Sequence, residues 1–275
     1  MNHKELSWNA PDGLTIYGQA WWNDSPKATL VMVHGMGEHS GRYAPYAQFL
    51  AEQGIAVLAY DHRGHGKSGG KRGHTPSYEI LLEGVTDALK QAENLFPETP
   101  KFIFGHSMGG NVVLNYALRR KPKVNGIIAS APWLKLAFDP PALQIALGKL
   151  VVGILPGLQQ RTKLDASAIS SIPAECEIYS KDPLVHDYIT PAFFLGTFDA
   201  AAWALENASD FNLPLYIYHG TADKLISPEG TKQFSAKIKG DITTKFWENQ
   251  YHESHYDTKR KEVMQATSDW ILAHI

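Results

Sequence analysis

The sequence predicts one α/β domain built on a mostly parallel β-sheet with helices on both faces. Two observations lead to this class: short β-branched apolar runs recur along the chain, and longer stretches with helical spacing lie between them. Runs that are apolar throughout are typical of strands buried on both faces, as in a parallel sheet. With 275 residues, 44% of them hydrophobic, the chain is long enough to bury one large core.

The expected strands and helices alternate along the chain. Residues 14–22 resemble a strand of an antiparallel hairpin that opens the sheet. Buried strands are expected at 30–33, 55–60, 102–104, 124–129 and 215–218, with a last strand at 244–247. Helices are expected at 43–53, 78–96, 112–120 and 228–238, with a closing helix at 259–275.

One interval breaks this alternation. Residues 133–191 contain several prolines and apolar segments with helical spacing, but no clear strand. We interpret this interval as an inserted, mainly helical cap, and residues 1–132 and 192–275 as the core. No flexible linker sets the cap apart, so we expect it to pack on the core as a lid.

Composition and charge exclude several classes of function. The 26 basic and 28 acidic residues give a formal net charge of −2, so no broad positive field would attract nucleic acid or an anionic membrane. Cys176 is the only cysteine, which rules out an intrachain disulfide, and we expect a structural thiol there. The first residues do not form an apolar signal segment. We therefore expect a cytoplasmic protein that is peripheral to membranes at most.

The strongest local motif is Gly105-His106-Ser107-Met108-Gly109, a Gly-x-Ser-x-Gly pattern that directly follows a predicted strand. A strand that reverses sharply into a helix holds the serine in a strained conformation with its hydroxyl exposed, and glycines leave room for the close backbone approach. The following helix points its positive amino-terminal end at the serine, where negative charge forms during acyl transfer. Ser107 is therefore the predicted nucleophile.

The serine needs an acid and a base, which in this arrangement follow it on loops after later strands. Asp223 lies just after the expected strand 215–218 and is the predicted acid. Asp199 and Asp210 are weaker candidates because both precede that strand. We expect His219 to pack at the end of the strand.

The predicted base is His252, which follows the last expected strand. His255 lies three residues further along the same loop and is the alternative, because the sequence alone does not define the loop geometry. The two histidines also have a spacing found in zinc sites. No third ligand accompanies them in a recognisable motif, so we expect no metal.

An ester hydrolase also needs two N–H groups that stabilise the tetrahedral oxyanion. One is expected from Met108, and the other from Met36 in the glycine-bounded turn 34–37, which follows the strand 30–33. The segment 61–68 contains two histidines but lacks the spacing of a phosphate-binding loop. We interpret it as a turn that supports the oxyanion loop.

At this point the sequence resembles the monoacylglycerol lipase family, in the serine lipase and lysophospholipase branch of the α/β-hydrolases. The matching stretches run through the whole core: 34–43, 61–68, 105–110, 130–132, 182–184, 219–223 and 251–252. The resemblance implies a triad of Ser107, Asp223 and His252, with Met36 and Met108 at the oxyanion hole. It also places three residues at the glycerol end of the substrate: Arg42, Tyr179 and His255.

The cap segment 141–158 is rich in leucine, isoleucine, valine and alanine, with Lys149 as its only charge. It has two compatible interpretations. It is a helix packed on the core, or an apolar lid that forms the mouth of an acyl tunnel and touches lipid aggregates.

The expected reaction is hydrolysis of monoacylglycerols to fatty acid and glycerol through an acyl-enzyme, without a metal or organic cofactor. Lysophospholipase or general carboxylesterase activity remains an alternative, because these enzymes use the same triad and differ only in the pocket. A non-catalytic binding protein with this fold is less favoured, because it has little reason to retain the triad and both oxyanion loops. The sequence does not predict the oligomeric state.

Overall fold

The computed structural model describes the chain except for residues 139, 141 and 163 and the side chains of residues 142–144. Its centre is an eight-stranded sheet in the order β1-β2-β4-β3-β5-β6-β9-β10. The strands are β1 Asn2–Asn9, β2 Thr15–Trp22, β3 Ala28–Val33, β4 Ile55–Tyr60, β5 Lys101–His106, β6 Gly126–Ser130, β9 Leu215–Gly220 and β10 Ile242–Trp247. All neighbours from β4 to β10 are parallel, while β1 with β2 and β2 with β4 are antiparallel. The predicted mostly parallel sheet is confirmed.

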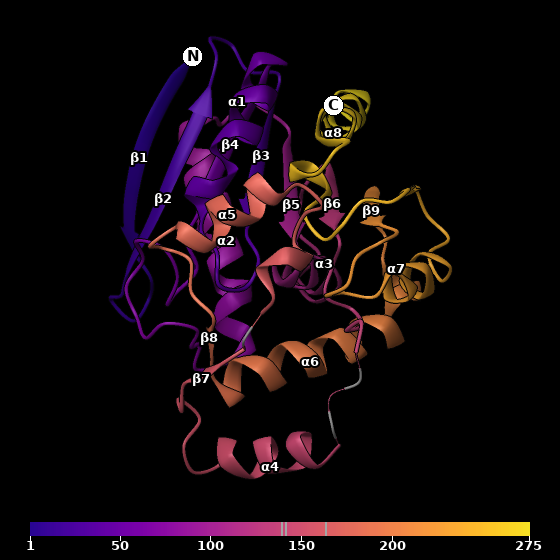
Figure 1. The fold of residues 1–275 in the computed structure, drawn as a ribbon. Helices are drawn as coiled ribbons and strands as arrows, with labels where there is room; N and C mark the ends of the chain where they lie inside the picture. The colour runs from indigo at the N-terminus through magenta and orange to yellow at the C-terminus, as the bar shows by residue number, and fades with distance from the viewer. Residues whose placement is uncertain (139, 141, 163) are drawn as a thin grey trace.

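Helices cover both faces of this sheet (Figure 1). The α-helices are α1 Ala44–Glu52, α2 Tyr78–Leu95, α3 Met108–Arg120, α4 Ala142–Val152, α5 Pro173–Lys181, α6 Pro191–Glu206, α7 Pro228–Ser235 and α8 Arg260–Ala273. Short 3₁₀ turns are η1 Ser40–Tyr43, η2 Ala166–Ala168, η3 Ala208–Asp210 and η4 Ser254–Tyr256. Each helix expected between strands is present, with ends shifted by a few residues.

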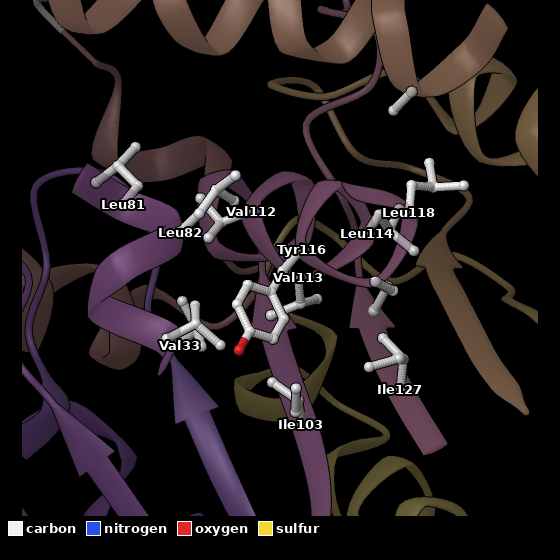
Figure 2. Close-up of a cluster of buried hydrophobic side chains, with 14 of the residues drawn as sticks. Val33, Leu81, Leu82, Ile103, Val112, Val113, Leu114, Tyr116, Leu118 and Ile127 are labelled. Atoms are coloured by element: carbon white, nitrogen blue, oxygen red, sulfur yellow. The ribbon is translucent and has the colours of Figure 1, made fainter. Parts of the chain in front are cut away.

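The strands are apolar throughout because each buries both of its faces. In β3, Leu30 and Met32 belong to the apolar cluster that includes residues of α1 and α8. Val31 and Val33 belong to the opposite cluster, which includes residues of α2 and α3. Side chains alternate between the faces of a strand, so one short run supplies two cores. Figure 2 shows the second cluster, where helical side chains meet those of β3, β5 and β6.

The opening hairpin contains a strand that the sequence pattern did not predict. β1 is mostly polar and exposed, and it pairs along its full length with β2. The apolar side chains of Leu6 and Trp8 point toward the core. Trp8 lies against Gly18 of β2, where any larger residue would overlap its ring. β1 forms one edge of the sheet and β10 forms the other.

Between β6 and β9 the described chain adds no strand to the large sheet and builds a layer over the carboxyl ends of the strands. α4 is the outermost helix, and α6 lies between it and α3 (Figure 1). The expectation of no strand in this interval is wrong in one detail: β7 Gln160–Arg161 and β8 Tyr188–Ile189 form a small antiparallel pair. Two residues are too few to produce a recognisable alternation. The limits of the cap at residues 133 and 191 stay a prediction.

The end of this interval is fastened to the core by backbone hydrogen bonds. The N–H of His186 donates to the Gly37 carbonyl at 2.8 Å, and the N–H of Thr190 donates to the Gly73 carbonyl at 3.0 Å. No described helix combines the length and the apolar composition needed to cross a bilayer.

The packing between the sheet and α8 predicts that truncating one buried side chain destabilises the fold. Phe102 of β5 is fully buried, and its ring packs edge-on against Trp270 of α8. We expect Phe102→Ala to lower the free energy of unfolding by about 3–5 kcal/mol, because it leaves a cavity between sheet and helix. Urea denaturation measures this change. Lys4→Ala, at an exposed position of β1, should stay within about 0.5 kcal/mol of the wild type, and equal losses in the two variants would contradict the predicted packing.

Candidate active site

Ser107 lies in the sharp turn between β5 and α3, with φ of 55° and ψ of −116°. Non-glycine residues rarely adopt a positive φ, so this backbone is strained and is held in place by its surroundings. A Cβ on Gly105 would lie 2.2 Å from the Gly109 carbonyl oxygen, and one on Gly109 would lie 2.1 Å from the Val33 carbonyl oxygen. Only glycines allow α3 to begin this close to β3 and β5.

Backbone hydrogen bonds hold the turn on both sides of the serine. The N–H of Ser107 donates to the Ser130 carbonyl at 2.9 Å, and its carbonyl accepts from the N–H of Trp133 at 2.8 Å. Met108 is the first residue of α3, so its N–H has no acceptor within the helix. This free donor lies at the positive end of the helix, where it is available to an oxyanion.

Asp223 and His252 meet at the carboxyl ends of β9 and β10. The Oδ2 atom of Asp223 lies 2.7 Å from Nδ1 of His252. The Oδ1 atom accepts from the N–H groups of Leu225 and Ile226 at 2.8 and 3.0 Å. With its Nδ1–H donated to the carboxylate, His252 keeps Nε2 free to accept a proton.

The buried pair stabilises its charges mutually. Burial alone would lower the pKa of His252, but the charge and hydrogen bond of Asp223 outweigh it and raise that pKa above its ordinary value. Burial would likewise raise the pKa of Asp223, but His252 and His219 hold it well below its usual range. The arrangement therefore favours an imidazolium beside a carboxylate, the state that forms when a base takes a proton from serine.

His219 contacts the same carboxylate and does not merely pack at its strand end. Its Nε2 lies 3.0 Å from Oδ2 of Asp223 and 3.1 Å from the Ile226 carbonyl oxygen. Both partners are acceptors, so Nε2 carries the proton and donates. Nδ1 then accepts from the hydroxyl of Thr231 at 2.7 Å. The exposed alternatives Asp199 and Asp210 lie on α6 and η3, and neither bonds a histidine among the described residues.

The loop after β3 lies beside the serine. A Cβ on Gly35 would lie 2.7 Å from Oε1 of Glu38 and 3.3 Å from Cβ of Ser107, so a side chain here would force the Glu38 carboxylate to shift. His34 accepts the N–H of His62 on Nε2 at 2.9 Å, and therefore donates its Nδ1–H to the Gly35 carbonyl at 2.7 Å. Burial lowers the pKa of His34 to about 4, so it stays neutral at neutral pH. The carbonyl of the Gly35–Met36 peptide is thus held, and in a trans peptide the Met36 N–H points the opposite way.

A buried ionic network joins this loop to the histidine loop. Arg42 donates to Glu38 at 2.8 Å and, through two nitrogens, to both oxygens of Glu253 at 2.7 Å. Glu38 also accepts from the Gly35 N–H at 2.6 Å and from the Tyr43 hydroxyl at 2.8 Å. Burial raises the pKa of Glu38, which Arg42 only partly opposes. In Glu253 the charge of Arg42 outweighs burial and lowers the pKa.

The three residues implied at the glycerol end lie in different places. Tyr179 of α5 lines the cavity over the site, and its ring centroid lies 4.6 Å from the Arg42 guanidinium carbon. Arg42 is not among the residues that line the cavity, and its guanidinium donates to Glu38 and Glu253. His255 is fully buried, stacked on Tyr43 and Tyr46, and is not among the residues that line the cavity. It lies in the short η4 turn, and neither of its ring nitrogens has a hydrogen-bond partner among the described residues, Asp223 included.

The cavity has a volume of about 1180 Å³, and both Ser107 and His252 line it. Its wall combines side chains of α4 and α6 with the chain between them. Apolar members of the wall include Leu147, Val151, Ile169, Phe194 and Leu195. Among the described residues, no three histidine, cysteine, aspartate or glutamate side chains converge as a metal site.

Two lining residues, Glu38 and Glu253, had no role in the sequence interpretation. Each adjoins a residue or motif that the sequence did single out, since Glu38 follows the glycine turn and Glu253 follows His252. Their shared partner, Arg42, is 211 residues from Glu253 in the chain. A pairing over that separation leaves no local pattern.

Comparison with known proteins covers nearly the whole chain. The model of the family described as serine aminopeptidase S33 matches residues 24–259. The monoacylglycerol lipase of Mycolicibacterium smegmatis is 31% identical over 274 residues, with 98% of each chain covered. The crystal structure of a Paleococcus ferrophilus monoacylglycerol lipase has 33% sequence identity and a TM-score of 0.86, with 100% of each chain covered.

An uncharacterized abhydrolase domain-containing protein of Dictyostelium discoideum is 36% identical over 253 residues. These residues make up 91% of this chain but 27% of that protein. The chain thus spans about a quarter of this longer relative and nearly all of the bacterial one.

The Asp223–His252 pair predicts how activity depends on pH. Protonated His252 cannot accept a proton, so kcat/KM should fall as the pH drops through a midpoint above about 6.5. Asp223→Asn should move this midpoint to lower pH, because a carboxylate favours the imidazolium, and should lower kcat by about 10⁴-fold. Rate profiles from pH 4 to 9 on a soluble ester measure both effects. Asp210→Asn is the control and should keep the wild-type profile; a shift of equal size there would refute the assignment of the acid.

Proposed function

Because this chain belongs to the family described as serine aminopeptidase S33 and is a carboxylic ester hydrolase of the α/β-hydrolase fold, we propose that it hydrolyses monoacylglycerols to fatty acid and glycerol. The family resemblance and the fold expected from the sequence are confirmed. The substrate proposal rests chiefly on one observation, the large, mainly apolar cavity that Ser107 and His252 line. Its chemistry suits an acyl chain next to a reacting ester.

In the proposed mechanism, Nε2 of His252 takes the proton of Ser107 as its hydroxyl oxygen attacks the ester carbonyl. Asp223 stabilises the resulting imidazolium through Nδ1. The oxyanion accepts hydrogen bonds from the N–H groups of Met36 and Met108. The imidazolium then protonates the leaving glycerol oxygen, which breaks the ester bond and leaves an acyl-enzyme. Water, deprotonated by the same nitrogen, releases the fatty acid and restores the serine.

The charges beside the site favour an uncharged headgroup. Glu38 and Glu253 share one guanidinium, that of Arg42, and both residues line the cavity. A glycerol hydroxyl can donate to a carboxylate oxygen, whereas a phosphodiester would bring a further negative charge toward this network. Tyr179 adds a hydroxyl to the same wall. This argument favours monoacylglycerol over lysophospholipid, the second candidate.

The cap in this proposal is a lid that receives the substrate from a lipid surface. On α4 and just beyond it, large apolar side chains face solvent, with Leu150 65% and Ile154 72% exposed. Exposed apolar side chains on an outer helix are suited to contact with a micelle or membrane. Leu147 is also exposed and lines the cavity, so one helix offers apolar side chains to both the lipid phase and the substrate.

The substrate proposal is tested by fatty acid release from monoacylglycerol, lysophosphatidylcholine and a short nitrophenyl ester. We expect monoacylglycerol to be preferred, and Ser107→Ala to lower kcat on all three by several orders of magnitude. A preference for the lysophospholipid or the short ester would retain the mechanism and replace the substrate. Serine-independent turnover, or no labelling of Ser107 by a fluorophosphonate, would refute the mechanism as well.

The lid proposal predicts a loss that depends on acyl-chain length. Leu147→Ser with Val151→Ser should lower kcat/KM on a long-chain monoacylglycerol by at least about 10-fold, because two apolar contacts are lost. Hydrolysis of the short nitrophenyl ester should change less than about twofold. Lys149→Ser on the same helix, whose side chain is not in the cavity wall, is the matched control. Equal losses on the two substrates would exclude this role of α4.

A further inference from the structure

Asp257 is a fully buried carboxylate next to the proposed base, and the mechanism above does not use it. Its Oδ2 accepts from the N–H of Tyr251 at 2.7 Å. Its Oδ1 accepts from the N–H of Thr258 at 2.8 Å, and from both the N–H, at 3.2 Å, and the hydroxyl of Ser171. All four donors are neutral groups. A buried carboxylate is costly unless hydrogen-bonded, so this geometry imposes strict positions on its partners.

The donors come from two parts of the fold. Tyr251 and Thr258 lie on the loop between β10 and α8 that contains His252, whereas Ser171 lies in the cap interval, between η2 and α5. Two further bonds join the same segments. The N–H of Glu253 donates to the Ile169 carbonyl at 2.7 Å, and the hydroxyl of Ser170 donates to the Tyr256 carbonyl at 3.0 Å.

Together these bonds frame His252 on both sides. The N–H of the residue before it, Tyr251, is held by Asp257. The N–H of the residue after it, Glu253, is held by the carbonyl of Ile169. Ile169 also lines the substrate cavity. The backbone that carries the imidazole is therefore tied to the segment that forms part of the cavity wall.

We propose that Asp257 is a positioning residue, which with Ser171 couples the cap wall to the His252 loop and holds the imidazole between Asp223 and Ser107. The inference rests on the proposed role of His252 as base. The imidazole must point Nδ1 at Asp223 and Nε2 at the serine at once, so a small rotation of its backbone weakens both contacts. Asp257 resists that rotation without touching the substrate.

The expected signature is a loss in kcat together with a changed pH profile. A misplaced His252 loses part of the stabilisation of its protonated form by Asp223, so the acid midpoint of kcat/KM should fall. The other titratable groups near His252 are Glu253, Glu38, His106 and His255. None of these is altered by the variants below, so they act as a constant background.

The test compares Asp257→Asn, Ser171→Ala and Glu175→Gln on a short soluble nitrophenyl ester. In Asp257→Asn we expect kcat to fall about 10- to 100-fold, with KM changed less than about twofold and the acid midpoint at lower pH. Ser171→Ala removes one hydrogen bond and leaves the charge of Asp257, so kcat should fall about fivefold with the midpoint moving the same way. Glu175→Gln is the matched control: it breaks the exposed 2.7 Å ion pair between Glu175 and Arg260, which also joins α5 to α8, and should leave kcat and the midpoint unchanged.

The outcomes separate this inference from the proposed function. Wild-type kcat and pH profile in Asp257→Asn, or equal losses in Glu175→Gln, would overturn the coupling. If Asp257→Asn does not fold, shown by its thermal melt, Ser171→Ala decides: an unchanged acid midpoint and kcat overturn the inference. Full activity in His252→Ala would instead overturn the assignment of the base.

Discussion

The close approach of α3 to β3 and β5 determines where the rest of the site can form. Two glycine positions, 105 and 109, leave no space for a side chain, and this contact forces the strained backbone of Ser107. Because parallel strands end at one edge of the sheet, the loops after β3, β9 and β10 all lie at the edge where Ser107 stands. The proposed oxyanion loop, acid and base therefore all depend on this backbone contact, because it positions the serine on which they would act.

The buried charges of this region are stabilised by hydrogen bonds and ion pairs with other protein groups, and not by water. Asp223 receives four hydrogen bonds, two of them from histidines, and in this way holds its charge despite burial. Arg42 pairs with both Glu38 and Glu253; its charge outweighs burial for Glu253 and opposes it only in part for Glu38. Such groups tolerate burial only while every partner stays in place. The site is thus rigid for an electrostatic reason, which suits a reaction whose charges must meet donors already in position.

The sequence predicted features that have a local signature and missed those that depend on distant pairing. The glycine motif around Ser107 and the apolar runs of the strands are local, so their places in the structure agree with expectation. The sequence did not predict β1, because most of its side chains are polar and only its pairing with β2 identifies it as a strand. No role was predicted for Asp257, because its hydrogen-bond partner Ser171 is 86 residues away in the chain. The resemblance implied a place for His255 at the glycerol end of the substrate, which stays a prediction; the burial of its ring against Tyr43 and Tyr46 has no local signature in the sequence.

The two edges of the sheet have a consequence for self-association. An edge strand presents unpaired N–H and C=O groups, to which a strand of another molecule can add. β1 carries exposed Lys4 and Glu5, and β10 carries exposed Lys245. Adding a strand of a second copy to either edge would strip water from these charged side chains. Charged edge strands oppose strand-mediated polymerisation, so the leucines exposed on α4 and Ile154 just beyond it are better suited to association than either edge of the sheet.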